Sequence, residues 1–531
     1  MTERHRAYLE WTVGLGLTLM LGVGLSLTAG WASIEHLEVS YLYEAVKPSS
    51  FWGVAASLQS AEQMHQPLFP WVLRLWCALG GTDELWIRLP SIAFASLTVF
   101  VAWRFARRHA GPLAALGAAL LVATSPLVVW YGKDCSPYAL LALLGALAFW
   151  SASDLLERPS RGRAIRTGVI LALAFYTHFF GAWLALIVGA WLLVAPASAF
   201  RPTIWVTATT ALLCLPALGL LVEKLFTSVH GLGEDQPVMR YSHTLGEAIP
   251  EALRVLFGGE HWLFVVGLAL TALGAWRSDG ALRKLAWVAG ALALLAELHV
   301  TWQIARSKGI VYVDIRHYVF LVPLVALLIA KAGRWAIPLA VAVQLTTSAP
   351  MLSGTLDKPD ARAAVSWVKR HAVTPADAVS FLPAPWYSGI VEYYLLGVCP
   401  ELVHGRSFDG WWTPATCALS EAALPGAVFG FPFGTERVWK AHRHRELKRL
   451  WLIDLRDHRF GLPVAPSSPQ EDFACWPGLG EVQIAGRHFG PWATVRVYDL
   501  EKLDRLGAPP APLERPVESV RAGDVWPIKC P

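Results

Sequence analysis

Charged residues are scarce in this chain of 531 residues, in which Asp, Glu, Lys and Arg make up 16% and hydrophobic residues 55%. A soluble protein carries about a quarter charged residues. The scarcity is confined to residues 11–350, where long apolar runs follow one another, whereas residues 351–531 read as ordinary globular sequence. This distribution excludes a wholly soluble protein. It predicts a polytopic α-helical membrane domain over residues 1–350 and a soluble α/β domain over residues 351–531.

A large basic surplus is also missing, because the net charge is only +5. The basic residues near the apolar runs are accounted for by membrane orientation, so the sequence indicates no nucleic-acid partner. The 26 tryptophans suit a membrane protein, since indole rings favour the membrane–water interface. The first apolar run, Trp11 to Trp31, is long enough to cross a bilayer, and no small-residue cleavage pattern follows it. It predicts an uncleaved first helix and not a signal peptide.

The apolar runs predict about eleven membrane spans, each of roughly 17–25 residues and shorter where a span is packed in protein. They are expected near residues 11–31, 87–105, 112–130, 137–153, 164–178, 181–200, 203–222, 260–276, 282–300, 316–333 and 335–350.

Every second connection between these runs is basic. The positive-inside rule therefore places these connections and the N-terminus in the cytoplasm. An odd number of spans then carries the C-terminal domain across the cell (inner) membrane to the extracytoplasmic, periplasmic side. The other connections face the same side, and acidic residues and histidines collect there. The main ones are 32–86, a long first outer loop, and 131–136, 223–259 and 301–315.

The soluble domain shows alternating helical and strand patterns. Residues 357–373 have an amphipathic helical pattern and residues 436–449 a charged helical one, whereas strands are expected at 378–382, 450–455 and 493–500. Such alternation predicts a small α/β layer. No complete soluble catalytic motif is found among these residues, so we expect a cap or docking platform over the membrane part.

Four of the seven cysteines lie in the soluble domain, where an oxidising periplasm permits disulfides. They are Cys399, Cys417, Cys475 and Cys530. Four cysteines allow three pairings, and the sequence does not select one. The other three, Cys77, Cys135 and Cys214, are expected to be small buried hydrophobic residues.

Ionisable residues stand at the outer ends of several apolar runs. Glu35 and Glu38 directly follow the first run, and a carboxylate in this position can act as a general base. Lys133 and Asp134 separate two apolar runs in "WYGKDCSPYALLALL", and Arg316 opens a later one. An Arg at membrane depth is costly unless it is paired or binds a ligand, and its guanidinium suits a phosphate oxygen.

Two interpretations of these residues remain open. Solvated loop charges and local salt bridges, such as one between Asp314 and Arg316, are the simpler alternative. If the ionisable residues instead meet on one face of the bundle, they suit a substrate with an anionic phosphate and a lipid tail. Lys133 is then a phosphate contact and Asp134 a second carboxylate of the site.

Five motifs occur in order along the membrane domain: "HQPLFPWVLRLW", "DELWIRLPS", "SPLVVWYGKDCSPYALLALL", "YTHFFG" and "IRHYVFLVPLVALLIA". Together they resemble the bacterial branch of the protein O-mannosyltransferase-like glycosyltransferases. That branch belongs to the GT-C membrane superfamily and includes the aminoarabinose transferases of lipid A. The resemblance implies inverting transfer of a sugar from a polyprenyl-phosphate donor to a lipid, glycan or protein acceptor at the outer membrane face.

The resemblance also implies roles for single residues. The family's Asp-Glu pair in the first outer loop is not retained, which leaves Glu35 or Glu38 as the base. Asp134 stands where the family usually has Glu, and would position the acceptor or hold a divalent cation such as Mg²⁺ or Mn²⁺. The donor phosphate is assigned to Lys133 and Arg316, and the substrate pocket to His65, Tyr138, His178 and Tyr318.

A non-catalytic protein that kept the bundle is the alternative function, either a lipid-linked sugar transporter or an assembly factor. A transporter is expected to show repeated halves and interrupted helices with polar residues near the membrane midplane. No convincing internal repeat is found in the sequence, and the polar residues gather at one face. This favours chemistry at the interface over transport.

Overall fold

The computed structural model describes residues 3–30, 32–34, 36–58, 66–195, 200–227, 263–308, 315–353, 360–371 and 377–382, and shorter stretches within 253–258 and 390–503. The chain divides into two compact units. The first consists of Met1–Trp31, Ser49–Val238 and Ser242–Thr355, and the second of Ala32–Pro48, Met239–Tyr241 and Leu356–Pro531. The segment Ala32–Pro48, shortly after the first helix, thus groups with the C-terminal part of the chain.

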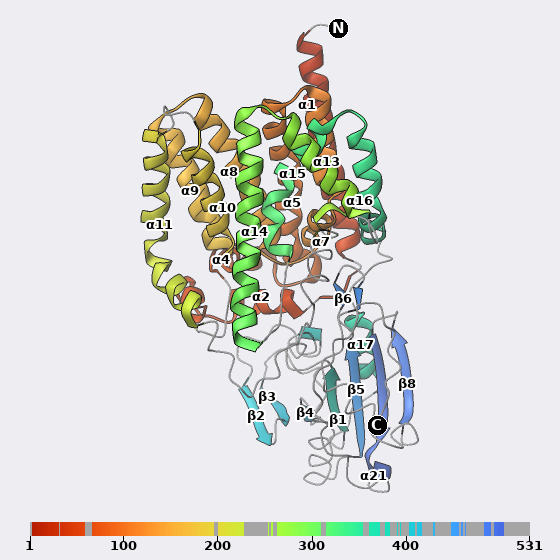
Figure 1. Ribbon diagram of the computed structural model, residues 1–531. Helices are drawn as coiled ribbons and strands as arrows, with labels where there is room; N and C mark the ends of the chain where they lie inside the picture. The colour runs from red at the N-terminus through yellow and green to blue at the C-terminus, as the bar shows by residue number, and fades with distance from the viewer. Residues whose placement is uncertain are drawn as a thin grey trace. The chain divides into compact units, whose positions relative to one another are not determined.

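Helices that lie side by side make up the first unit (Figure 1). Each of the eleven apolar runs predicted from the sequence coincides with one or more of them, and α3 and α4 lie in the predicted outer loop. The helices are α1 (Glu3–Ala29), α3 (Phe51–Ser57), α4 (Leu68–Gly80), α5 (Glu84–His109), α6 (Pro112–Ala123), α7 (Pro126–Gly132), α8 (Tyr138–Glu157), α9 (Arg161–Thr177), α10 (Gly181–Leu193), α11 (Phe200–Thr227), α13 (Phe264–Arg277), α14 (Gly280–Lys308), the 3₁₀-helix η2 (Ile315–Leu321), α15 (Val322–Ala332) and α16 (Ala336–Leu352).

Among the described residues, three helical segments are long and apolar enough to cross a membrane: Trp11–Ala29, Glu84–His109 and Tyr138–Glu157. The pair α6 and α7 gives a fourth if it is counted as one bent span. The helical nature of the membrane part is therefore confirmed. The number of eleven spans stays a prediction.

The run predicted at 112–130 is not one continuous helix. It bends by 53° between α6 and α7. Pro126 opens α7, and a proline has no backbone N–H and crowds the carbonyl four residues earlier, which breaks a helix at this point. The hydroxyl of Thr124, at the break, donates a hydrogen bond of 2.7 Å to Gln344 Oε1 on α16. A polar contact between helices thus accompanies the interruption.

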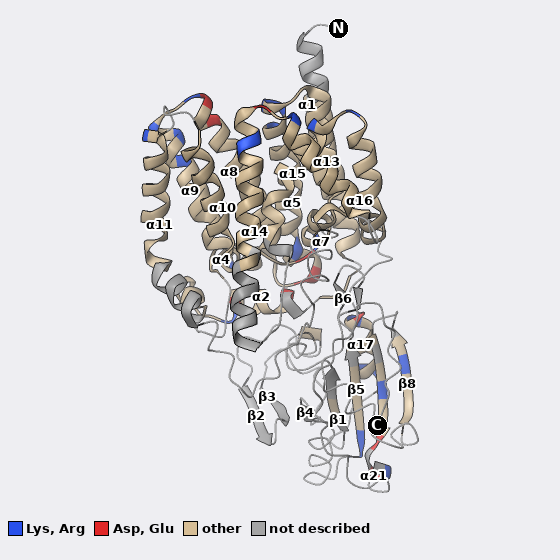
Figure 2. Ribbon diagram, in the orientation of Figure 1, with Lys and Arg blue, Asp and Glu red and all other residues tan. Residues whose placement is uncertain are grey.

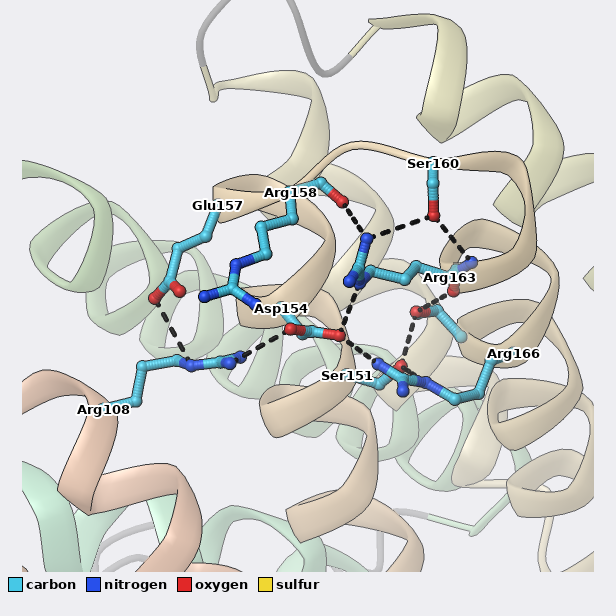
Figure 3. A network of polar contacts seen from close by, with 9 residues as sticks. Arg108, Ser151, Asp154, Glu157, Arg158, Ser160, Arg163 and Arg166 are labelled. Atoms are coloured by element: carbon cyan, nitrogen blue, oxygen red, sulfur yellow. Dashed lines mark hydrogen bonds and ion pairs between the residues drawn. The ribbon is translucent and has the colours of Figure 1, made fainter.

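One carboxylate binds three guanidinium groups where α5 and α8 end and α9 begins (Figure 3). Asp154 accepts hydrogen bonds from Arg108 Nη2 at 3.0 Å, Arg163 Nε at 2.9 Å and Arg166 Nη2 at 2.7 Å. Arg108 also forms an ion pair of 3.4 Å with Glu157. Charge-assisted bonds of this kind are about twice as strong as neutral ones. Asp154 therefore ties together three helices.

Basic residues gather at this end of the first unit (Figure 2). The helix α8 starts at Tyr138 and has 20 residues, so its two ends lie about 30 Å apart. The Asp154 network and the first turn of α8 are therefore at opposite ends of the same helix.

The second unit contains a seven-stranded sheet with the order β2-β3-β4-β1-β5-β9-β8. β1 runs parallel to its neighbours β4 and β5, and the other neighbouring pairs are antiparallel. The helix α17 packs on β5, β8 and β9. The elements are α2 (His36–Val46), α17 (Ala361–Arg370), β1 (Asp377–Leu382), β2 (Val403–Phe408), β3 (Trp411–Thr416), β4 (Val428–Gly430), β5 (Arg449–Leu455), β6 (His458–Arg459), β7 (Leu462–Pro463), β8 (Gln483–Phe489), β9 (Ala493–Asp499) and α21 (Leu500–Leu503).

Several local predictions for this part of the chain agree with these elements. The amphipathic pattern at 357–373 contains α17, and the strands expected at 378–382, 450–455 and 493–500 coincide with β1, β5 and β9. The charged stretch at 436–447 and the cysteines at 399, 417, 475 and 530 lie outside the described residues. In the first unit Cys77 and Cys135 are buried, as predicted, and Cys214 is partly exposed.

We predict that Asp154→Asn lowers the free energy of unfolding by roughly 2–3 kcal/mol, because three guanidinium groups lose their shared carboxylate at a partly buried helix junction. The matched control is Glu157→Gln, whose side chain is 47% exposed and pairs with one arginine. It should cost about 0.5 kcal/mol or less. Thermal unfolding of the purified protein in detergent measures both. Equal losses in the two variants would contradict the role given to Asp154.

Candidate functional site

Five aromatic side chains from three distant parts of the first unit form a continuous series, here called the aromatic ladder: Tyr131, Tyr138, His178, Phe180 and Tyr318. Neighbouring ring centroids are 4.6 Å apart for Tyr131 and Tyr138, 5.5 Å for Tyr138 and His178, 5.8 Å for His178 and Phe180, and 5.4 Å for Phe180 and Tyr318. The structure thus brings together three residues that the resemblance assigned to a substrate pocket, Tyr138, His178 and Tyr318.

A glycine fixes the place of Tyr318. The helix η2 packs against α8, and a Cβ atom on Gly145 of α8 would lie 2.5 Å from the carbonyl oxygen of Phe320. Only a residue without a side chain lets the two backbones approach so closely. This contact sets η2, and with it Tyr318, beside the first half of α8.

The imidazole of His178 is oriented by the turn that follows α9. His178 ends α9, and its Nδ1 accepts a hydrogen bond of 3.2 Å from the backbone N–H of Phe180. An accepting Nδ1 carries no proton, so the neutral ring holds its proton on Nε2. The turn therefore selects the tautomer of a ring in the middle of the ladder.

Lys133 and Asp134 lie between α7 and α8 and are 4% and 1% exposed. The Lys133 ammonium donates a hydrogen bond of 2.7 Å to the carbonyl of Met351 in the last turn of α16. Carbonyl groups at a helix C-terminus attract cations, so this bond anchors the turn between α7 and α8 to α16. An ammonium has three donors, and one of them has this structural partner. The predicted contact of Lys133 with a phosphate stays a prediction.

The other predicted site residues are described to different extents. Glu38 lies in the first turn of α2, in the second unit, and is fully buried. The backbone of Arg316 belongs to η2, but its side chain is outside the described part. Glu35 and His65 lie outside the described residues. Within the described residues, no group of three or more His, Cys, Asp or Glu side chains could hold a metal ion. The metal prediction is untested.

Arg88 is a structural anchor to which the sequence analysis gave no role. It belongs to α5, is fully buried, and donates a hydrogen bond of 2.6 Å to the carbonyl of Ala29, the last residue of α1. A fully buried guanidinium is costly unless its donors are used. Its place inside the apolar run "DELWIRLPS" was the sequence signal that could have identified it.

Gln66 is a second residue of note, because its polar side chain is almost fully buried. It is 2% exposed, and neither Nε2 nor Oε1 has a hydrogen-bond partner among the described residues. A buried primary amide offers two donors and one acceptor oxygen, and leaving them unused costs about 1–3 kcal/mol for each group. Such an amide can recognise a polar ligand.

Residues 64–219 match the family model described as dolichyl-phosphate-mannose-protein mannosyltransferase. Among solved structures, the fold is similar to that of ArnT from Cupriavidus metallidurans in the apo state, with a TM-score of 0.55 and 14% identity over 92% of this chain and 98% of that chain. ArnT bound to undecaprenyl phosphate gives a TM-score of 0.50 and 12% identity over 93% and 98%.

The apo oligosaccharyltransferase of Archaeoglobus fulgidus gives a TM-score of 0.50 and 11% identity over 84% of this chain and 69% of that chain. No curated protein matches the chain. The family model and the fold shared with ArnT agree with the resemblance predicted from the sequence.

We predict that Gly145→Ala displaces η2 from α8 and lowers the free energy of unfolding by about 1–3 kcal/mol, because the added methyl group collides with the backbone of Phe320. The control is Gly189→Ala in α10, where the new methyl group meets nothing within 4 Å. This variant should be neutral or stabilised by up to about 1 kcal/mol. Thermal unfolding compares them. A fully stable Gly145→Ala protein would refute the close contact.

Replacing Gln66 by Leu should raise the melting temperature, because it removes buried polar atoms that have no hydrogen bond among the described residues. The matched control, Gln344→Leu, deletes the acceptor of the Thr124 bond at a site that is 4% exposed, and should be destabilised by about 1–2 kcal/mol. A destabilised Gln66→Leu protein would show that the amide has a structural role.

Proposed function

We propose that the protein is a membrane glycosyltransferase that moves a sugar from a polyprenyl-phosphate donor to an acceptor at the extracytoplasmic face, with inversion at the anomeric carbon. The observation that carries this proposal is the aromatic ladder, since it unites three residues assigned to a substrate pocket from separate motifs. The fold shared with ArnT, which has been solved with undecaprenyl phosphate, supports a lipid-phosphate donor.

In the proposed reaction the acceptor hydroxyl attacks the anomeric carbon as the bond from that carbon to the phosphate oxygen breaks. A single displacement of this kind inverts the configuration. Glu38, or Glu35 in its place, takes the proton of the acceptor hydroxyl, and Asp134 orients that acceptor. The polyprenyl phosphate leaves with the bonding electron pair. Arg316 and Lys133 stabilise the charge that develops on it.

A divalent cation, Mg²⁺ or Mn²⁺, is a separate proposal. Asp134 is the residue we expect to hold it, because hard cations take carboxylate oxygens as ligands. When bound, the cation would neutralise phosphate charge. Turnover with and without a chelator tests the proposal, and unchanged turnover in excess EDTA would contradict it.

The proposed orientation rests on the two ends of α8. The end with Arg108, Arg163 and Arg166 fits the cytoplasmic side by the positive-inside rule. Tyr138 begins the other end, about 30 Å away. We therefore assign the ladder to the extracytoplasmic side of the cell membrane. The odd number of predicted spans assigns residues 351–531 to the extracytoplasmic side as well.

Transport of a lipid-linked sugar is the second candidate function. One observation favours it, namely the interruption between α6 and α7 with its polar contact from Thr124 to Gln344, since transporters bind substrates at broken helices. A transporter moves the lipid-linked sugar between leaflets without cleaving it. An assay that measures both the release of polyprenyl phosphate and the movement of the lipid-linked sugar between leaflets separates the two functions.

We predict that the purified protein in lipid vesicles releases polyprenyl phosphate from at least one member of a panel of polyprenyl-phosphate sugars. Glu38→Gln and Asp134→Asn should lower turnover by about 10²-fold or more, because each removes a carboxylate assigned to proton transfer or acceptor binding. Glu35→Gln decides between the two candidate bases. The control is Glu157→Gln at the basic end of α8, which should keep full turnover.

Two results would contradict this account. If no donor is cleaved but one crosses the vesicle membrane, the protein is a transporter. If a donor is cleaved and none of the three carboxylate variants changes turnover, the assignment of base and acceptor residues is wrong.

A further inference from the structure

Ala32, Ser33 and Ile34 lie shortly after α1, which ends at Ala29. They are bound by residues more than 320 positions away in the chain. The Ser33 hydroxyl donates a hydrogen bond of 3.2 Å to Asp360 Oδ1 and accepts one of 3.1 Å from the backbone N–H of Arg362. Both partners belong to the same compact unit as Ser33. The Ser33 hydroxyl thus acts as both donor and acceptor in its bonds with the first residues of α17.

Its two neighbours are bound through their backbones. The carbonyl of Ala32 accepts a hydrogen bond of 3.3 Å from Arg362 Nη2, and the N–H of Ile34 donates one of 2.7 Å to the hydroxyl of Tyr394. We call the set Asp360, Arg362 and Tyr394 the loop clamp. Ala32, Ser33 and Ile34 are 3%, 2% and 1% exposed. Hydrogen bonds in such buried surroundings are costly to lose.

The clamp is built on regular structure. Asp360 is the N-cap of α17, and the Oδ1 atom that accepts from Ser33 also accepts from the backbone N–H of Ala363. An N-cap bond contributes about 1 kcal/mol to a helix, so Asp360 has a fixed rotamer. The carbonyl of Tyr394 is in turn bound by Lys369 Nζ of α17 at 3.2 Å. Because α17 packs on β5, β8 and β9, the clamp rests on the sheet.

The clamped residues lead directly into the helix with the proposed base. α2 begins at His36, two residues after Ile34, and Glu38 lies in its first turn. The side chains of Glu38 and Leu42 are fully buried, and Val39 is 2% exposed. The position of the Glu38 carboxylate therefore depends on where the preceding segment is fixed.

We propose that Asp360, Arg362 and Tyr394 are positioning residues for α2, so that the C-terminal part of the chain sets the place of the general base. This inference rests on the proposed function for its kinetic consequence alone. A general base must lie within hydrogen-bond distance of the proton that it takes, and an error of 1 Å in position can cost 10²-fold in rate. The C-terminal residues thereby have a role beyond the cap or docking platform expected from the sequence.

The first test measures amide hydrogen exchange of residues 36–46 in the full-length protein in lipid nanodiscs. Arg362→Ala and Tyr394→Phe each delete one bond to the clamped segment, and Tyr394→Phe keeps the ring. Exchange in both variants should be about tenfold faster or more, because α2 then opens locally. The matched control is Arg370→Ala on the same helix, whose Nε contacts only the local carbonyl of Ser366 in the described structure. Unchanged exchange in both clamp variants would overturn the inference.

The second test measures turnover of the lipid-linked donor by the same variants. If the Glu38 carboxylate is displaced, kcat should fall by about tenfold or more. KM for the donor should stay within about twofold, because donor binding does not need the base. Ser33→Ala should behave like the clamp variants, and Ser33→Thr, which keeps the hydroxyl, should restore kcat. Variants with the kcat and exchange of the wild type would refute positioning.

The two tests distinguish failure of the proposed function from failure of the positioning inference. If the wild-type protein cleaves no donor, the proposed function fails, and the exchange measurement still decides whether the clamp holds α2. If the wild-type protein cleaves a donor but the clamp variants match it in kcat, the positioning inference fails and the glycosyltransferase proposal stands.

Discussion

The contact between the backbone of η2 and Gly145 of α8 is the constraint on which the candidate site depends. It places Tyr318 beside a helix that is more than 160 residues earlier in the chain, and the ring of Phe180 then bridges Tyr318 and His178. Without that close approach Tyr138 and His178 would remain neighbours, but η2 would not complete the ladder. The site thus follows from the absence of one side chain.

Buried charged side chains fix the positions of other helices in the first unit. A charge removed from water needs partners, and the bundle supplies them at helix ends: Met351 for Lys133, Ala29 for Arg88, and three arginines for Asp154. The bonds of Lys133 to Met351, Arg88 to Ala29 and Arg108 to Asp154 join residues that are 218, 59 and 46 positions apart in the chain. Charged residues are few in this unit, and Lys133, Arg88 and Asp154 hold neighbouring helices together.

Much of the helical framework could be predicted from the sequence, because a bilayer requires long apolar runs and their positions are visible in one dimension. Local patterns also located α17, β1, β5 and β9. The break between α6 and α7 was not predicted, although Pro126 marks it, since hydropathy stays high across the break. The order of the seven strands could not be predicted, because pairing between distant strands leaves no local signal.

For the site, sequence motifs found Tyr138, His178 and Tyr318, and the structure joined them. Lys133 binds the backbone carbonyl of Met351, and Arg88 binds that of Ala29. A backbone carbonyl carries no residue-type signal, so no sequence pattern could have revealed these two contacts. The same holds for the bonds from Arg362 and Tyr394 to the backbone of Ala32 and Ile34.

The central claim is that the aromatic ladder lines a pocket for a lipid-linked sugar. An experimental structure of the protein with a non-cleavable polyprenyl-phosphonate sugar tests this claim most directly. The account predicts the sugar in contact with Tyr138, His178 or Tyr318 and the phosphonate within reach of Arg316. A ligand bound at the break between α6 and α7, away from these rings, would contradict it.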